Sequence, residues 1–228
     1  MTDFLLEFKD IQCGYGDTQI IHGISGGVKK GETLAVFGRN GVGKTTLSRA
    51  LTGEIPVTSG SVNLDGARIT KKLSFARRRD GISYMPQTGM VFDKLTVREN
   101  LSLANSKTSP EMYFDIFPRL AERLDQQAGS MSGGERKILS FVRVMLEETL
   151  IAVLDEPSEG VQPENIENMQ NCILAKQKAG CSFILIEQNL SMLLAVADCY
   201  LGVESGRVVF EGDKTNCQRD DLLSVLSI

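Results

Sequence analysis

The segment GRNGVGKTT, residues 38–46, constrains the fold of this 228-residue chain more than any other feature. It fits the pattern G-x-x-x-x-G-K-[ST], in which glycines let successive backbone N–H groups converge on phosphate oxygens. The apolar run ETLAVF precedes it, and TTLSRALTGEI follows with helical spacing. A strand, a glycine loop and a helix in this order predict a parallel α/β fold in which the helix N-terminus points at a bound phosphate.

This loop predicts a site for ATP and Mg²⁺. Lys44 has the length to reach the β- and γ-phosphates, and the hydroxyl of Thr45 can bind Mg²⁺. The alternative is a glycine-rich turn that binds nothing, but the flanking strand and helix favour the phosphate site. The expected nucleotide-binding residues of the loop are Gly38, Arg39, Asn40, Gly41, Val42, Gly43, Lys44, Thr45 and Thr46.

Two carboxylates follow an almost unbroken apolar run, LIAVLDEP, which is typical of a buried central strand. Asp155 at the end of this strand is expected close to Mg²⁺. Glu156 is expected to point toward the nucleotide, where a carboxylate can take a proton from water that attacks the γ-phosphate. Acidic residues also end strands before proline turns without any such role, which is the alternative interpretation here.

The stretch MSGGE, residues 131–135, precedes the strongly helical ERKILSFVRVML. Ser132 and Glu135 fit a capping box, which accounts for the local structure. A capping box does not require Gly133 and Gly134, which expose backbone N–H groups at a helix N-terminus and so predict a second anion site. Because one nucleotide already has its own loop, we interpret this second site as serving the ATP of another molecule.

The remaining chain alternates strand-like and helical segments. Strands are expected at 4–12, 20–28, 59–69, 81–87 and 182–188, with a hairpin at 199–212 that turns at Ser-Gly. A helical pattern covers 94–146, with Thr96 as its N-cap, and an amphipathic helix at 165–180 ends at Gly180. The helical middle therefore resembles an insertion into an α/β core.

Composition excludes several classes of protein. The net charge of −4 argues against a surface that binds nucleic acid over the whole molecule. No apolar run approaches the ~18 residues of a membrane span, and the N-terminus lacks a signal-peptide pattern. Five scattered cysteines without C-x-x-C and a single histidine, His22, predict buried thiols in a reducing cytosol rather than a metal site or disulfides.

The motifs GRNGVGKTT, MPQ, SGGE and VLDEP, in this order, resemble those of the ATP-binding subunit of ABC transporters. This resemblance implies one domain, 1–228: a P-loop core at 1–87 and 149–228 with an N-terminal antiparallel layer, and an inserted helical subdomain at about 88–148 that docks on the permease. In this family two domains pair head to tail. Each ATP then lies between the phosphate loop of one subunit and the signature Ser-Gly-Gly of a second, identical or related subunit.

Further roles follow from the resemblance alone. Tyr15 matches the aromatic residue that stacks on adenine, although an ordinary tyrosine at a strand end is the alternative. Gln87 matches the glutamine that reaches Mg²⁺ and water, against the alternative of a solvent-facing loop amide. Three positions depart from the usual pattern, since Glu135 replaces a glutamine, Gln162 an aspartate and Gln188 the switch histidine. The resemblance implies that Gln188, like Glu156, is catalytic and takes the place of an imidazole that contacts the γ-phosphate, but as a neutral hydrogen-bond donor it positions groups rather than stabilising charge.

The segments PSEGVQP, LIEQN and VESGRVVFEG resemble the importer branch that serves branched-chain amino acids, or urea and short amides, with SEGVQP slightly closer to the urea type. The resemblance implies ATP-driven import at the cytoplasmic face of a bacterial inner membrane, an indirect periplasmic solute-binding partner, and no nucleic acid. Two alternatives are a nucleotide-dependent module with little hydrolysis and a soluble relative that acts on DNA or ribosomes. The latter usually has a coiled-coil insertion or two ATPase halves, and this chain shows neither.

Overall fold

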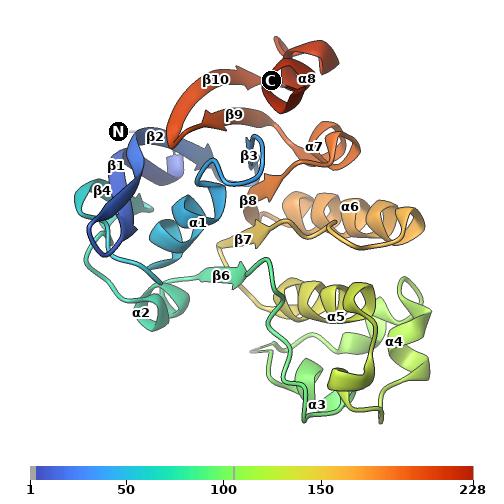
Figure 1. Ribbon diagram of the computed structural model, residues 1–228. Helices are drawn as coiled ribbons and strands as arrows, with labels where there is room; N and C mark the ends of the chain where they lie inside the picture. Colours follow the sequence, from blue (N-terminus) through green and yellow to red (C-terminus); the bar gives the residue numbers. More distant parts are fainter. Residues whose placement is uncertain (1–3, 105, 228) are drawn as a thin grey trace.

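The computed structural model describes residues 4–104 and 106–227, in which a mixed central sheet is flanked by helices and by a second, antiparallel sheet (Figure 1). Asn105, residues 1–3 and residue 228, which belong to the predicted domain, lie outside this described part. Across the described residues the central sheet has the strand order β10-β9-β3-β8-β7-β6. Its strands are β3 (Thr33–Phe37), β6 (Ile82–Met85), β7 (Ile151–Asp155), β8 (Ser182–Glu187), β9 (Cys199–Glu204) and β10 (Arg207–Asp213).

The middle of this sheet is parallel and buried on both faces. Strands β9, β3, β8, β7 and β6 run parallel, and only β10 pairs antiparallel with β9. Ile151 and Val153 of β7 face one core, whereas Ala152 and Leu154 face another. Because successive side chains of a strand point to opposite faces, an unbroken apolar run is what a strand between two cores requires.

The antiparallel layer has the order β2-β1-β4-β5 and covers helix α1 (Lys44–Thr52) on the side away from the central sheet (Figure 1). Its strands are β1 (Phe4–Tyr15), β2 (Thr18–Lys29), β4 (Ser59–Leu64) and β5 (Ala67–Arg68). Leu47 and Leu51 of α1 are buried between the two sheets together with Phe8 of β1. The predicted α/β class and N-terminal antiparallel layer are therefore confirmed.

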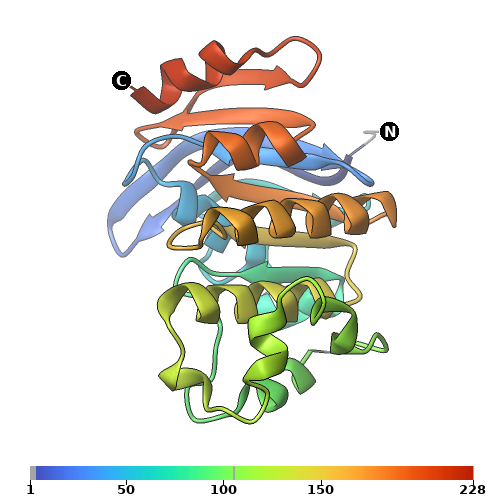
Figure 2. The same ribbon diagram turned by 90° about the vertical axis from the view of Figure 1, so that its right-hand side faces the viewer.

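On the opposite face of the sheet lie α5 (Gly133–Leu146), α6 (Pro163–Lys178) and α7 (Leu190–Val196) (Figure 2). Helix α6 ends as predicted before Gly180, whose φ is 97°. The hairpin β9–β10 also turns as predicted at Ser205 and Gly206, with φ values of 47° and 71°. Helices α2 (Ser74–Arg79), α7 and α8 (Arg219–Ser227) were not among the elements expected from the sequence.

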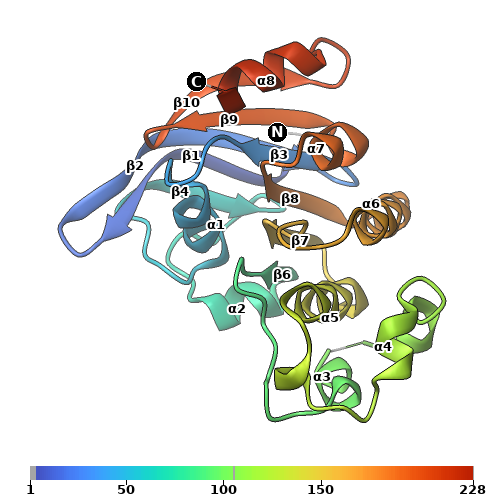
Figure 3. The same cartoon turned by 45° about the vertical axis from the view of Figure 1, so that its right-hand side comes forward.

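The segment between β6 and β7 is helical, but not continuously (Figure 3). Short pieces precede α5: α3 (Val97–Ser102), the 3₁₀ turn η1 (Pro110–Tyr113), α4 (Pro118–Glu122) and the 3₁₀ turn η2 (Ala128–Ser130). Thr96 caps α3 as predicted, with a complete capping box. The continuous helical pattern is broken because Pro110 and Pro118 lack the N–H that a helix interior needs, so each begins a new turn.

The cysteines of the described chain are free thiols. Cys13, Cys172 and Cys181 are buried as predicted, whereas Cys199 and Cys217 are only partly buried. Burial raises the pKa of Cys13 to about 11, which keeps this thiol protonated and unreactive. Among the described residues, no helix combines the length and the apolar character that crossing a membrane requires.

Candidate functional site

The glycine loop joins the end of β3 to the start of α1, as the sequence predicts. Gly38 has a φ of 147°, and a Cβ there would lie 2.2 Å from the carbonyl oxygen of Val203 on the neighbouring strand. Gly43, the N-cap of α1, has a φ of 106°. These two glycines let the loop turn sharply against β9 and direct the N–H groups of α1 into the concave side of the loop.

Lys44 lies inside this loop and is 4% exposed. Its Nζ donates to the carbonyl oxygens of Gly38 and Arg39, at 2.8 Å each, and lies 3.6 Å from Glu156 Oε1. Burial lowers the pKa of Lys44, and the charges of nearby carboxylates, Glu156 foremost, counteract part of this effect. The ammonium group therefore forms internal contacts that phosphate oxygens can replace.

Asp155 is fully buried at the end of β7 and accepts hydrogen bonds from α1. Thr45 Oγ1 donates to Asp155 Oδ1 at 3.2 Å, and Ser48 Oγ donates to Oδ2 at 2.9 Å. Burial raises the pKa of Asp155, and these hydrogen bonds oppose the rise. Thr45 and Asp155, both predicted to lie close to Mg²⁺, are thus in direct contact, and Ser48 is a partner that the sequence did not indicate.

Glu156 is the centre of a second hydrogen-bonded group. It is 5% exposed and adopts a φ of 48°, a left-handed conformation that is uncommon outside glycine. Gln188 Nε2 donates to Glu156 Oε1 at 2.8 Å and to Asn40 Oδ1 at 2.7 Å. Gln87 Nε2 donates to Glu156 Oε2 at 2.8 Å and to Glu159 at 3.3 Å, so its amide reaches these acids rather than Asp155.

Lys44, Gln87 and Glu156 line a hollow of about 230 Å³ at the carboxyl ends of the parallel strands. Asp155 and Gln188 contact residues of this lining but do not line the hollow themselves. Tyr15 stands at its edge, 45% exposed, and accepts a hydrogen bond from Arg49 at 3.1 Å. Gly38, Arg39 and Val42 belong to the loop but do not line the hollow. The residues that line it are Tyr15, Ile20, Asn40, Gly41, Gly43, Lys44, Thr45, Thr46, Gln87 and Glu156.

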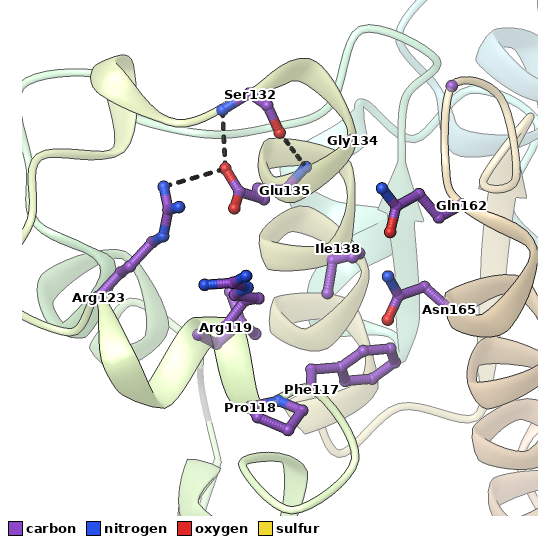
Figure 4. Close-up of a pocket in the computed structure, with 12 residues that line it drawn as sticks. Phe117, Pro118, Arg119, Arg123, Ser132, Gly134, Glu135, Ile138, Gln162 and Asn165 are labelled. Carbon is purple, nitrogen blue, oxygen red and sulfur yellow. Dashed lines mark hydrogen bonds and ion pairs between the residues drawn. The ribbon is translucent and has the colours of Figure 1, made fainter.

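The SGGE segment lies at the N-terminus of α5 (Figure 4). Its residues are not among those that line the hollow around Lys44. Ser132, Gly134 and Glu135 line a separate hollow of about 380 Å³ between α4, α5 and the start of α6. The predicted capping box is present, since Ser132 Oγ accepts from Glu135 N at 3.3 Å and Glu135 Oε2 accepts from Ser132 N at 2.9 Å. A Cβ on Gly134 would lie 2.7 Å from the carbonyl oxygen of Gly160, so only glycine fits.

Two residues of the site, Glu187 and Lys137, were assigned no role from the sequence. Glu187, 3% exposed, accepts from Ser158 Oγ at 2.8 Å and from the backbone N–H groups of Gln188 and Asn189 at 2.8 and 2.9 Å. The signal that could have found it is an acid at the end of the buried run SFILIE.

Lys137 connects α5 to the loops around the hollow. Its Nζ donates to the carbonyl oxygen of Gln87 at 2.5 Å and to that of Glu156 at 3.0 Å, and lies 3.6 Å from Glu159. The signal that could have found Lys137 is a lysine on the same helix face as the apolar Phe141 and Val144. The SGGE helix and the Glu156 loop are therefore fixed to each other within one chain.

The site combines a glycine loop before a helix with a buried aspartate and an adjacent glutamate at the carboxyl ends of parallel strands. This combination defines a P-loop nucleoside triphosphatase. The profile described as ABC transporter matches residues 21–159. The chain belongs to the ABC transporter family, whose ATP-binding subunits bind and hydrolyse ATP.

The alignments with similar proteins cover nearly the whole chain. One is the high-affinity branched-chain amino acid transport ATP-binding protein BraG of Pseudomonas aeruginosa, 36% identical over 90% of this chain and 91% of BraG. Another is a probable branched-chain amino acid transport ATP-binding protein, LivF, of Archaeoglobus fulgidus, 34% identical over 91% of this chain and 92% of LivF. A nucleotide-free ATP-binding cassette from an ABC transporter superposes with a TM-score of 0.81 at 27% identity, covering 99% of this chain and 96% of the other. The predicted fold is thus confirmed.

Proposed function

We propose that this chain is the ATPase subunit of an importer for branched-chain amino acids. The similarity to BraG and LivF over about nine tenths of each chain supports this solute class. The SEGVQP segment favours urea and short amides as the second candidate class. In either case the solute is selected by a periplasmic binding protein and by transmembrane permease subunits, while this chain acts at the cytoplasmic face of a bacterial inner membrane.

The observation that carries the proposal is the separation of two phosphate-binding elements within one chain. Lys44 and the glycine loop line one hollow, and Ser132 with Gly134 lines another. One chain therefore presents two half-sites, and each is completed by the opposite half-site of a facing ATPase subunit. Two ATP molecules bound between the subunits close such a dimer, and hydrolysis reopens it.

Within each composite site the residues of this chain have distinct tasks. Lys44 exchanges its contacts with loop carbonyls for contacts with phosphate oxygens. Glu156 accepts the proton of the attacking water, and Gln188 orients the Glu156 carboxylate through their hydrogen bond. Tyr15 stacks on the adenine from the edge of the hollow, and the N–H groups at the start of α5 receive the phosphate of the facing site.

The residues around Asp155 fit Mg²⁺, which prefers oxygen ligands. The Thr45 hydroxyl and the Asp155 carboxylate are in contact at 3.2 Å, and a cation would offset the cost of burying this carboxylate. Gln87 can join them through its side-chain oxygen. Residues 4–104 and 106–227 contain no cluster of three or more His, Cys, Asp or Glu that could hold a metal, so phosphates and water must supply the remaining ligands. When bound, Mg²⁺ neutralises charge on the β- and γ-phosphates.

The same proposal assigns parts of the chain to parts of the transporter. Residues 1–87 and 149–228 form the nucleotide-binding core, and residues of about 88–148 form the subdomain that contacts the permease. Gln87 stands at the boundary and contacts Glu156, while Lys137 of the helical part contacts both of their backbones. These contacts connect the helical subdomain, which we assign to the permease interface, directly to the residues of the hydrolytic centre.

Dimer closure tests the composite site. Glu156→Gln with ATP is expected to elute as a dimer on size-exclusion chromatography, and adding Ser132→Arg should return it to the monomer position without weakening ATP binding to the glycine loop. If the facing subunit is a related chain, the same assay uses the co-expressed pair. A Ser132→Arg variant that dimerises and turns over ATP at the parent rate would contradict the composite site.

The solute class requires the assembled transporter. Co-expressed subunits in proteoliposomes are supplied with binding protein and with radiolabelled leucine or urea, using Glu156→Gln as the inactive control. ATP-dependent leucine uptake supports the proposal, and uptake of urea alone would transfer the function to the second class.

A further inference from the structure

We propose that Arg123 is a positioning residue that lets an acidic signature segment accept a nucleotide, by holding the Glu135 carboxylate against the Ser132 N–H group and compensating its charge. This inference rests on the proposed composite site. A carboxylate at the fourth position of SGGE lies in the helix turn that would receive a triphosphate, and like charges repel.

The Glu135 side chain is folded back over the start of its own helix (Figure 4). Its Oε2 accepts from Ser132 N at 2.9 Å and from Arg123 Nη1 at 3.2 Å. The two donors reach the same oxygen from different segments. The carboxylate is therefore fixed by a backbone N–H group and by the guanidinium group. It also accepts a hydrogen bond from an N–H group that would otherwise lack a partner at the start of α5.

The cation is well placed to do this because α4 is firmly packed. Leu120 and Phe117 are buried, and the ring of Phe117 packs edge-on against Phe141 of α5, with 6.3 Å between centroids. Arg123 follows directly as the C-cap of α4. Its backbone is thus held relative to α5, and its guanidinium group is partly shielded, with 31% of the side chain exposed.

Electrostatics agrees with the geometry. Burial acts to raise the pKa of Glu135, but the hydrogen bonds from Ser132 and the charges of Arg123 and Arg119 together lower it by more, so the net shift is downward. Glu135 is therefore ionised at neutral pH. Without Arg123, that negative charge would have one fewer neighbour of opposite sign beside the incoming phosphates.

Arg119 provides a matched control on the same helix. It points into the same hollow (Figure 4), but its Nη1 pairs with Glu122 at 2.9 Å and 69% of its side chain is exposed. Its interaction with Glu135 is consequently screened by solvent. Removing Arg119 should affect nucleotide use much less than removing Arg123.

The test is a double-mutant cycle on ATP turnover by the full chain with its facing subunit. Arg123→Gln should raise KM for ATP about three- to tenfold with a smaller change in kcat, because the repulsion acts on binding. Arg119→Gln should change KM less than about twofold. Arg123→Lys keeps the positive charge, so its KM for ATP should lie close to that of the parent. This variant provides the test if Arg123→Gln folds poorly.

The decisive variant combines Arg123→Gln with Glu135→Gln. If Arg123 compensates the Glu135 charge, the double variant should return KM to within about twofold of Glu135→Gln alone. If Arg123 only supports the fold, the double variant should remain as impaired as Arg123→Gln, and that result would overturn the inference. Salt is a second readout, since the defect of Arg123→Gln should shrink at high ionic strength.

Failure of the inference is distinguishable from failure of the composite site. Loss of turnover in Ser132→Arg together with an unrescued Arg123→Gln rejects only the role of Arg123. Normal turnover in Ser132→Arg rejects the composite site itself, and the inference with it.

Discussion

Gln188 donates its side-chain amide to the carboxylate of Glu156 at 2.8 Å. The contact joins the ends of β8 and β7, and the same amide also reaches Asn40 of the glycine loop at 2.7 Å. A neutral amide thus occupies the position where the family pattern places a histidine. It can orient the glutamate without adding a charge to the site, and without titrating near neutral pH.

The first prediction concerns this amide. Gln188→His introduces a group whose ordinary pKa is about 6.5, so kcat should acquire a fall on the acid side of that value, where the imidazolium pairs with Glu156 and weakens it as a base. The measurement is kcat between about pH 5.5 and 8.5 for both proteins, a range that spans the titration of imidazole. Identical profiles for the parent and the variant would show that residue 188 does not act on Glu156.

Glu156→Gln should keep ATP binding and lower hydrolysis by about 100-fold or more, because an amide cannot accept the proton of the attacking water. The amide oxygen of the substituted side chain can still accept from Gln188, while its NH₂ group replaces the oxygen that accepts from Gln87. Phosphate release and nucleotide binding are measured side by side. Hydrolysis at the parent rate would place the base elsewhere.

Lys44→Ala should weaken ATP binding by about 10- to 100-fold, because a charge-assisted contact to the phosphates is lost. Binding of a fluorescent ATP analogue gives the affinity, and Lys30→Ala, at an exposed site, is the control. Equal affinities for Lys44→Ala and the control would contradict the assignment of Lys44.

Asp155→Asn should stabilise the nucleotide-free protein by about 1 kcal/mol at pH 7 while abolishing turnover. Burial raises the pKa of Asp155 above its ordinary value of 3.8, so the native state holds this proton more tightly than the unfolded state. The resulting contribution to stability is present below pH 3.8 and is lost as pH rises through the folded pKa. Urea unfolding of the parent and of Asp155→Asn, measured from below pH 3.8 to pH 7, checks the sign of this contribution to stability. A variant less stable than the parent at pH 7 would refute the prediction.

Glu187→Gln replaces one acceptor oxygen by an NH₂ group that faces N–H and O–H donors. The free energy of unfolding should fall by about 1–3 kcal/mol, since a buried polar group loses its partner. Turnover should fall about tenfold or more as Gln188 shifts. Glu204→Gln, which changes an exposed carboxylate on β9, is the control for both measurements. A normal rate in Glu187→Gln would limit Glu187 to a role in stability.

Local patterns were sufficient for much of the fold. The apolar run before Asp155 predicted a strand buried on both faces, and the Ser-Gly pair predicted the β9–β10 turn. The glycine loop predicted the strand, loop and helix that β3 and α1 form. In each case neighbouring residues determine the conformation, because the steric limits of glycine and the alternation of a strand act over a few residues.

The sequence by itself determined the types of chemical group and their order along the chain, including the glycine loop and the SGGE segment about ninety residues apart. Only the tertiary structure decided that Glu187 accepts hydrogen bonds from Ser158, that Lys137 joins Gln87 to Glu156, and that Arg123 contacts Glu135. These contacts join residues distant in sequence or on different elements. Their distances depend on how strands and helices pack, and local propensity contains no information about that packing.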